Sequence, residues 1–164
     1  MKTPGFHLRI LLLCVITVIS SCDEKEPADI RDQAIGDYDY EATVYVLDGS
    51  MLNFLFAENG SCTLTKTDDG IEVNGDGLLI FGGNQVAALG NGFSFQIQSQ
   101  EVDIDGDNVD IEGYAHIEIA GSTTRYQGVY FPGDKRFSAY FKFNATLNGD
   151  PVTAVIGFVG DKVD

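Results

Sequence analysis

Eight Asp-Gly or Asn-Gly dipeptides divide the chain between residues 48 and 149. Such pairs favour tight turns, because glycine, and to a lesser extent Asn and Asp, adopt positive φ with little strain. The runs between them are rich in Val, Ile, Thr, Phe and Tyr, and their apolar and polar residues alternate. This pattern predicts about nine or ten antiparallel strands between Val44 and Val159, joined by short turns rather than by crossover helices.

The turn dipeptides also predict the register of the last strands. A turn at Asn148-Gly149 pairs apolar residues on one face: Ala145 with Val152, Phe143 with Ala154, and Phe141 with Ile156. A turn at Gly133-Asp134 extends that face: Phe137 pairs with Tyr130, Ala139 with Gly128, and Phe141 with Tyr126. The opposite face is mostly polar. One side of these strands is therefore expected to be buried and the other solvated.

The expected fold class is all-β, an antiparallel up-and-down β-barrel, because a sheet of this size tends to close and so removes its edges. A two-sheet β-sandwich is the alternative. The polar outward face excludes a transmembrane barrel, whose outward residues would be apolar.

Residues 1–21 have the features of an export signal: Lys2 and Arg9 precede a mostly apolar run at 10–19, and two serines follow. That run would reach only about 15 Å as a helix, so a permanent membrane span is not expected. Ile19-Ser-Ser-Cys22 resembles a bacterial lipobox, which implies that Cys22 is lipidated. The alternative is an ordinary secretory signal cut near Ser21. Residues 22–35 are polar and are expected to form a flexible acidic tether with at most one helical turn, and residues 36–164 a single β-barrel domain.

Net charge limits the partners. The whole chain has 10 basic and 25 acidic residues, and removal of residues 1–21 takes away two of the basic ones. Such a surface repels nucleic acid and anionic lipid headgroups, so we expect no nucleic-acid partner. Membrane attachment would therefore depend on the lipid anchor.

A resemblance to a known family rests on four features: the lipobox, the acidic tether, the opening segment AIGDYDYEATVYV and the closing segment VIGFVGDK. Together they resemble the calycin-like (lipocalin-like) β-barrel lipoproteins of Gram-negative anaerobic bacteria. The resemblance implies a calycin barrel in the cell envelope, anchored to the outer membrane by lipid. Asp23, Glu24 and Glu26 resemble the surface-export signal of that group, while the cell-surface and periplasmic faces both stay open.

The inward aromatic residues suggest a binding function. Seven of them are candidates to line a cavity for a small hydrophobic ligand: Phe93, Phe95, Tyr126, Tyr130, Phe137, Phe141 and Phe143. Gly113 and Gly128 would leave room on the cavity wall. The alternative is a barrel filled by its own side chains, which would make the protein an interaction or assembly lipoprotein with an envelope protein partner.

The acidic segment EVDIDGDNVDIE at 101–112 is a candidate hairpin. A turn centred on Gly106-Asp107 would place Asp103 opposite Asp110 and Glu101 opposite Glu112, and like charges in such pairs destabilise a sheet. Calcium would relieve this repulsion, with Asp103, Asp105, Asp107 and Asp110 as candidate ligands, although the spacing is not that of an EF-hand. A solvated acidic hairpin without any cofactor is the alternative.

Catalysis has little support in the sequence. His116 is the only histidine after residue 21 and is expected on the outer face; Cys62 alternates like a buried strand residue, and no serine lies in a G-x-S-x-G motif. The protein is therefore expected not to be an enzyme, and a hydrolase is the weakest of the functional alternatives.

Overall fold

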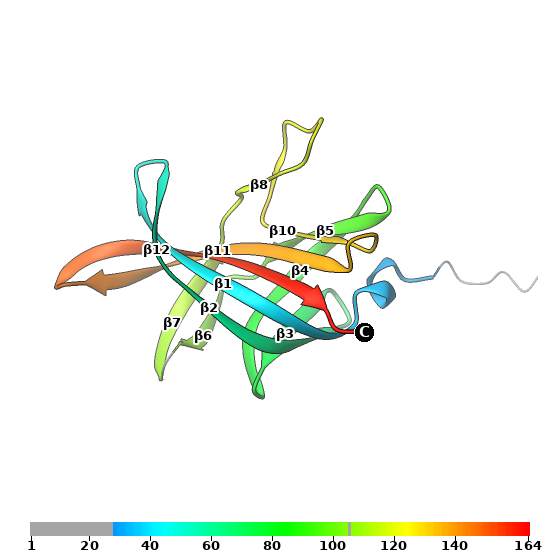
Figure 1. Ribbon diagram of the computed structural model, residues 1–164, viewed down its shortest axis with the longest axis horizontal. Helices are drawn as coiled ribbons and strands as arrows, with labels where there is room; N and C mark the ends of the chain where they lie inside the picture. Colours follow the sequence, from blue (N-terminus) through cyan, green and yellow to red (C-terminus); the bar gives the residue numbers. More distant parts are fainter. Residues whose placement is uncertain (1–27, 105) are drawn as a thin grey trace, which may run out of the picture.

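The computed structural model describes residues 28–104 and 106–164 (Figure 1). These residues form twelve strands and one short 3₁₀ helix, η1 (Ile30–Gln33), with no α-helix among them. The strands are β1 (Gly36–Asp48), β2 (Met51–Lys66), β3 (Ile71–Gly75), β4 (Leu78–Leu89), β5 (Gly92–Ile97), β6 (Gln100–Ile104), β7 (Asp107–Gly113), β8 (Ile117–Glu118), β9 (Arg125–Tyr126), β10 (Gly128–Phe131), β11 (Arg136–Leu147) and β12 (Asp150–Lys162).

Ten of the strands form one antiparallel sheet in the order β10-β5-β4-β3-β2-β1-β12-β11-β7-β6. Because β10 also pairs with β11, eight strands (β1–β5 and β10–β12) form a ring of hydrogen-bonded neighbours. The β6–β7 hairpin continues the sheet from β11, and β8 and β9 form a separate two-stranded sheet. The predicted all-β antiparallel class is confirmed, and the partly closed ring fits either of the two predicted arrangements, a barrel or a sandwich.

The register predicted for the last hairpin is confirmed, since Phe141 pairs with Ile156 and Phe143 with Ala154. The two pairs predicted between β10 and the start of β11 are also correct. The prediction that Phe141 lies opposite Tyr126 is wrong: its partner is Gly113.

The reason for this difference lies at Gln127, after which the chain rejoins the ten-stranded sheet at β10. The side-chain Oε1 of Gln127 accepts a hydrogen bond from the Ile97 N–H at 2.9 Å. The same side chain fills the space beside Gly113, where a Cβ atom would lie 1.9 Å from its oxygen. Tyr126 consequently lies in β9, where it pairs with Ile117.

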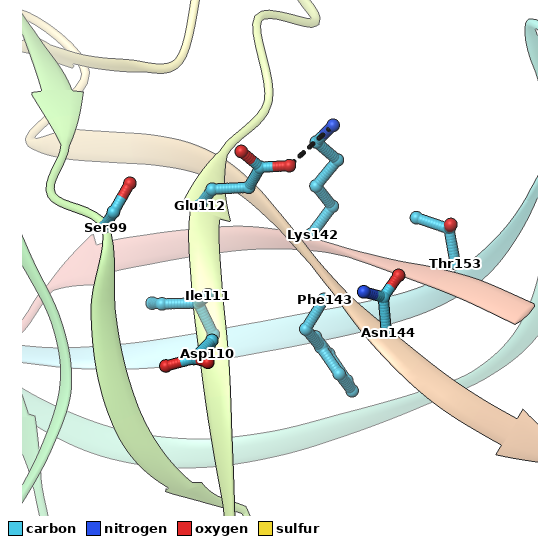
Figure 2. Close-up of a pocket in the computed structure, with 8 residues that line it drawn as sticks. All are labelled: Ser99, Asp110, Ile111, Glu112, Lys142, Phe143, Asn144 and Thr153. Carbon is cyan, nitrogen blue, oxygen red and sulfur yellow. Dashed lines mark ion pairs between the residues drawn. The ribbon is translucent and has the colours of Figure 1, made fainter.

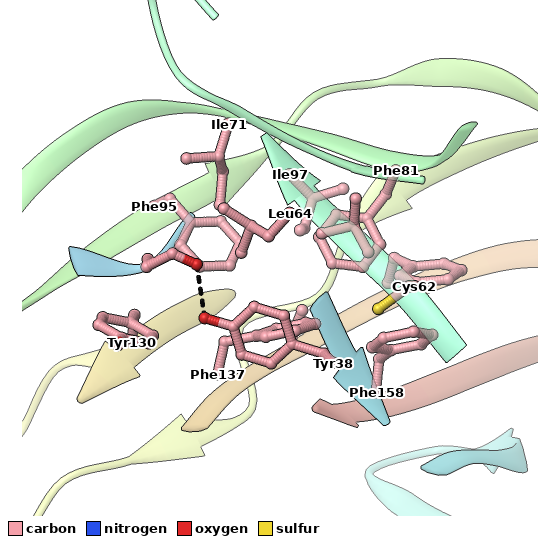
Figure 3. Packing of buried hydrophobic residues seen from close by; sticks show 14 of the residues in the cluster. Tyr38, Cys62, Leu64, Ile71, Phe81, Phe95, Ile97, Tyr130, Phe137 and Phe158 are labelled. Atoms are coloured by element: carbon pink, nitrogen blue, oxygen red, sulfur yellow. Dashed lines mark hydrogen bonds between the residues drawn. The ribbon is translucent and has the colours of Figure 1, made fainter. Parts of the chain in front are cut away.

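One end of the ring is packed with aromatic and aliphatic side chains (Figure 3). Tyr38, Phe81 and Phe137 are fully buried there. The Tyr38 ring meets Phe137 edge to face with centroids 4.9 Å apart. Such pairs add stability beyond the area that they bury.

The segment that contains η1 is part of this packed end. Ala34 is fully buried, and its carbonyl accepts a 2.5 Å hydrogen bond from the Tyr38 hydroxyl (Figure 3). The Tyr130 hydroxyl donates to the Gln33 carbonyl at 2.8 Å. The Arg31 guanidinium binds the carbonyl of Gly70 at 2.9 Å, which ties η1 to the loop between β2 and β3. The second half of the predicted tether is thus folded against the ring, and its expected single helical turn is η1.

At the opposite end, the β1–β2 and β11–β12 hairpins extend beyond the ring (Figure 1). β1 and β2 slip register by one residue between Val44 and Tyr45, and the hairpin continues from there to its turn after Asp48. A bulge of this kind bends the strand that carries it.

Candidate functional site

A cleft opens between β4 and β6, beside the packed end. β4 pairs with β3 along its first half and with β5 from Gly83 onward. Within the part of the chain that the structure describes, the other edge of residues 78–82 has no strand partner. β6 lies against this edge without joining it by a ladder. The gap between the two strands therefore exposes part of the ring's interior.

A β-bulge explains why the two strands separate. Val73 pairs with Phe81, whereas the next residue, Asn74, pairs with Leu79. Ile80 is consequently an extra residue in β4 at this point. A bulge bends and twists its strand, and this one lies in the part of β4 that lines the cleft beside β6.

A single side chain bridges the gap at its narrow end. The Gln100 amide accepts a hydrogen bond from the Gly82 N–H at 3.2 Å and donates one to the Gly82 carbonyl at 3.3 Å. The Gln98 N–H donates to the same carbonyl at 2.9 Å. These bonds hold the start of β6 to β4, while the rest of β6 diverges and forms one wall of the cleft.

The cleft has a volume of about 320 Å³, and most of its lining is apolar. Its walls come from β1, β4, β6, β11 and β12, through Ala42, Ile80, Val102, Ile104, Phe141 and Ile156 among others. Ligand pockets usually have volumes of roughly 300–1,000 Å³, so this one suits a small ligand. The sequence does not predict this cleft, because the bulge in β4 leaves no mark on the alternation of apolar and polar residues.

The charged side chains that line the cleft are acidic. Among the residues that the structure describes, the cleft lining includes the carboxylates of Asp76 and Asp103 and no Lys, Arg or His. The Tyr40 side chain also lines the cleft. The pKa of its hydroxyl is raised mainly by burial, and further by the negative charges that Cys62, Asp76 and Glu58 carry when they are ionised. A negative potential at the cleft would act on Tyr40 in this direction.

Most of the seven predicted cavity residues lie in the packed end. Five of them are buried: Phe93, Phe95, Tyr130, Phe137 and Phe141. Phe93 contacts both Phe95 and Tyr130, with ring centroids 6.2 and 5.4 Å away. Of the seven, only Phe141 lines the cleft. Phe143 is half-buried and lines a second groove, and Tyr126 lies outside the ten-stranded sheet.

The two glycines expected to leave room on the wall do not do so. A Cβ atom on Gly128 would lie 2.1 Å from the Phe95 ring, and Gly113 is covered by the Gln127 side chain. Neighbouring side chains occupy both positions, so the open space lies at the cleft instead.

The predicted acidic hairpin is present as β6 and β7, but its predicted register is wrong by two residues. Ile104 pairs with Asp107, so Asp103 faces Asn108 rather than Asp110. Neither predicted like-charge pair forms, although Glu101 now faces Asp110. The turn is centred one residue earlier than predicted, and Gly106 there has the positive φ of 87° that a tight turn needs.

The predicted calcium ligands are only partly described. Asp105 lies outside the described residues, and the Asp103 carboxylate accepts a hydrogen bond from the Gly106 N–H at 2.9 Å. Within residues 28–104 and 106–164, no three acidic, His or Cys residues are grouped closely enough to hold a metal ion. A calcium site stays a prediction, which a titration of melting temperature with Ca²⁺ can test.

A second groove, of about 280 Å³, lies between β7 and β11 (Figure 2). It forms where these strands separate after pairing at only two positions. Lys142 and Glu112 form an ion pair across it at 2.8 Å, and Ser99 and Thr153 add hydroxyl groups. In the described part of the chain, no histidine lies beside these hydroxyl groups in the lining of the groove.

The other nucleophile and base candidates also lie apart. Cys62 is only 4 % exposed, as the alternation predicted, and burial raises the pKa of its thiol to about 12. A thiol of this kind is inert at neutral pH. His116 stacks on Tyr114 with ring centroids 5.6 Å apart, and its ring lies tilted against Tyr140 at 4.9 Å.

The predicted signal segment and Cys22 lie outside the described residues. Among the residues that are described, no helix is long and apolar enough to cross a membrane. No protein-family model, curated protein or solved structure matches this chain.

Proposed function

We propose that this protein is a lipid-anchored protein of the cell envelope that binds a small apolar ligand and carries out no catalysis. The observation that carries the ligand proposal is the apolar cleft of about 320 Å³ between β4 and β6. Apolar surface in a concave, partly shielded site favours apolar ligands, because binding removes both surfaces from water.

The proposed location rests on the amino-terminal sequence. Cys22 of the lipobox-like segment would carry the lipid, and the outer membrane is the proposed site of attachment, on either face. The described chain starts at residue 28 beside η1, at the end of the ring away from the long hairpins (Figure 1). A lipid six residues earlier would hold the packed end toward the bilayer. The meander of β1–β5 and β10–β12 supports the proposed calycin-like barrel.

Binding of N-phenyl-1-naphthylamine, a neutral fluorescent probe, tests the ligand proposal. Residues 28–164 contain the whole described core, so the chain from Asp23 onward can be used without signal or lipid. Fluorescence should rise saturably with the native sequence. Ala42→Leu, which fills the cleft, should abolish this rise, while Ala87→Leu on an exposed part of β4 should not. Thermal unfolding followed by circular dichroism checks that both variants fold.

Two results would contradict the proposal: no saturable binding to the native sequence, or equal binding to the folded Ala42→Leu variant. An apolar molecule that is released when the purified protein is extracted with organic solvent would support it and would identify the natural ligand.

A second candidate function, the interaction lipoprotein, is favoured by the β1–β2 hairpin. Met51 and Phe54 are 63 and 64 % exposed, and Leu55 and Phe56 lie beside them. Clusters of exposed large apolar residues often mark protein interfaces. A photo-crosslinker at Phe54 should then capture a discrete envelope protein that the same crosslinker at Asp134 does not capture. Equal capture at both positions would count against this function.

A further inference from the structure

The cleft combines an apolar interior with negative charge contributed by two separate elements. Asp76 follows β3 in the turn before β4, and Asp103 belongs to β6. Both line the cleft, and no positively charged residue within 28–104 or 106–164 lines it. The site is therefore apolar along its walls and anionic where these two exposed side chains meet solvent.

The two carboxylates are not neutralised by other parts of the described protein. The described residues form seven ion pairs, and neither Asp76 nor Asp103 takes part in any of them. One oxygen of the Asp103 carboxylate accepts the Gly106 N–H at 2.9 Å. The excess of acidic over basic residues, 25 to 10 in the chain, leaves few internal cations to compensate them.

We propose that the cleft selects small amphiphilic amines: the apolar part packs against Ile80, Val102 and Ile104, and the ammonium group pairs with Asp76 and Asp103. This inference rests on the proposed ligand-binding function and names the chemical class of the ligand. A fatty acid of the same length would place its carboxylate against two like charges. A neutral alcohol would gain the apolar contacts alone.

Three probes with the same alkyl chain separate these possibilities: octylammonium, octan-1-ol and octanoate. At neutral pH the first is cationic, the second is neutral and the third is anionic. Two exposed ion pairs of ordinary strength should make octylammonium bind roughly 2- to 30-fold more tightly than octan-1-ol. Octanoate should bind most weakly, and about 0.5 M NaCl should reduce the difference among the three probes.

Isothermal titration calorimetry on the chain from Asp23 onward measures the affinities, and NMR shifts of the Ile80 and Ile104 methyl groups locate the probe. Asp76→Asn and Asp103→Asn should each reduce the preference for octylammonium, and the double variant should abolish it while octan-1-ol affinity stays unchanged. Asn keeps an oxygen that can accept the Gly106 N–H. Asp134→Asn is the matched control, since Asp134 lies in the turn between β10 and β11 and does not line the cleft.

The outcomes distinguish the two proposals. If none of the three probes binds, the cleft is not an apolar ligand site and both proposals are wrong. Equal binding of all three, or a preference for octylammonium that survives the double variant, would overturn the amine class while leaving the ligand site in place. Tightest binding by octanoate would also overturn it.

Discussion

Gly128→Ala tests whether the aromatic end of the ring is packed or hollow. Gly128 is buried in β10 beside Phe95, and an added Cβ would lie 2.1 Å from the Phe95 ring. That ring has little room to move, because Phe81 and Phe93 are both fully buried and lie 6.4 and 6.2 Å away between centroids. Adding a methyl group to a filled core costs about 1–3 kcal/mol, and this short contact predicts the upper half of that range.

Urea unfolding followed by circular dichroism and tyrosine fluorescence measures the effect, since the chain has no tryptophan. Gly133→Ala is the matched control. Gly133 lies in the turn between β10 and β11, its φ is not positive, and a Cβ there would meet nothing within 4 Å. Its unfolding free energy should stay within about 0.5 kcal/mol of the native value.

A double variant separates overpacking from other causes. Phe95→Leu removes ring atoms that would overlap the new methyl group, so Gly128→Ala should destabilise that background less. The coupling free energy between the two substitutions is expected to be at least about 1 kcal/mol. If Gly128→Ala changes stability by less than about 0.5 kcal/mol, this end has space for a methyl group and the packed-end assignment is wrong.

Three further substitutions test other features. Tyr38→Phe removes the hydrogen bond to the buried Ala34 carbonyl and should lower the unfolding free energy by about 1–3 kcal/mol; a loss below about 0.5 kcal/mol in urea unfolding would contradict this. Burial raises the pKa of the Cys62 thiol from 9.0 to about 12, so between these pH values the thiol ionises more readily in the unfolded chain and stability falls as pH rises. The free energy of unfolding of Cys62→Ala should therefore fall less steeply with pH, by up to about 1.4 kcal/mol per pH unit, than that of the native sequence. Equal pH slopes of the unfolding free energy in the two proteins would refute this prediction. Gln100→Ala breaks the hydrogen bonds to Gly82, so amide hydrogen exchange in β6, measured by NMR, should accelerate several-fold while exchange in β12 stays unchanged. If exchange in β6 changes no more than exchange in β12, the Gln100 side chain does not hold β6 to β4.

The sequence alone determined the features that depend on neighbouring residues. Alternation and turn dipeptides predicted antiparallel strands, and Asn148-Gly149 correctly predicted the register of the β11–β12 hairpin. A short turn links residues that are close in the chain, so its position sets their pairing. The same reasoning explains the error in the acidic hairpin, where moving the turn centre by one residue shifts every pair by two.

Only the tertiary structure decided the features that depend on distant segments. The pairing of Phe141 with Gly113 of β7 follows from where the chain rejoins the sheet after Gln127, which alternation does not encode. The bulge at Ile80 separates β4 from β6 and opens the cleft. The pairing of β7 with β11, which places the β6–β7 hairpin beside the ring, also brings Asp103 into the same cleft as Asp76. Their charges act together because of long-range strand pairing, which no local pattern in the sequence reveals.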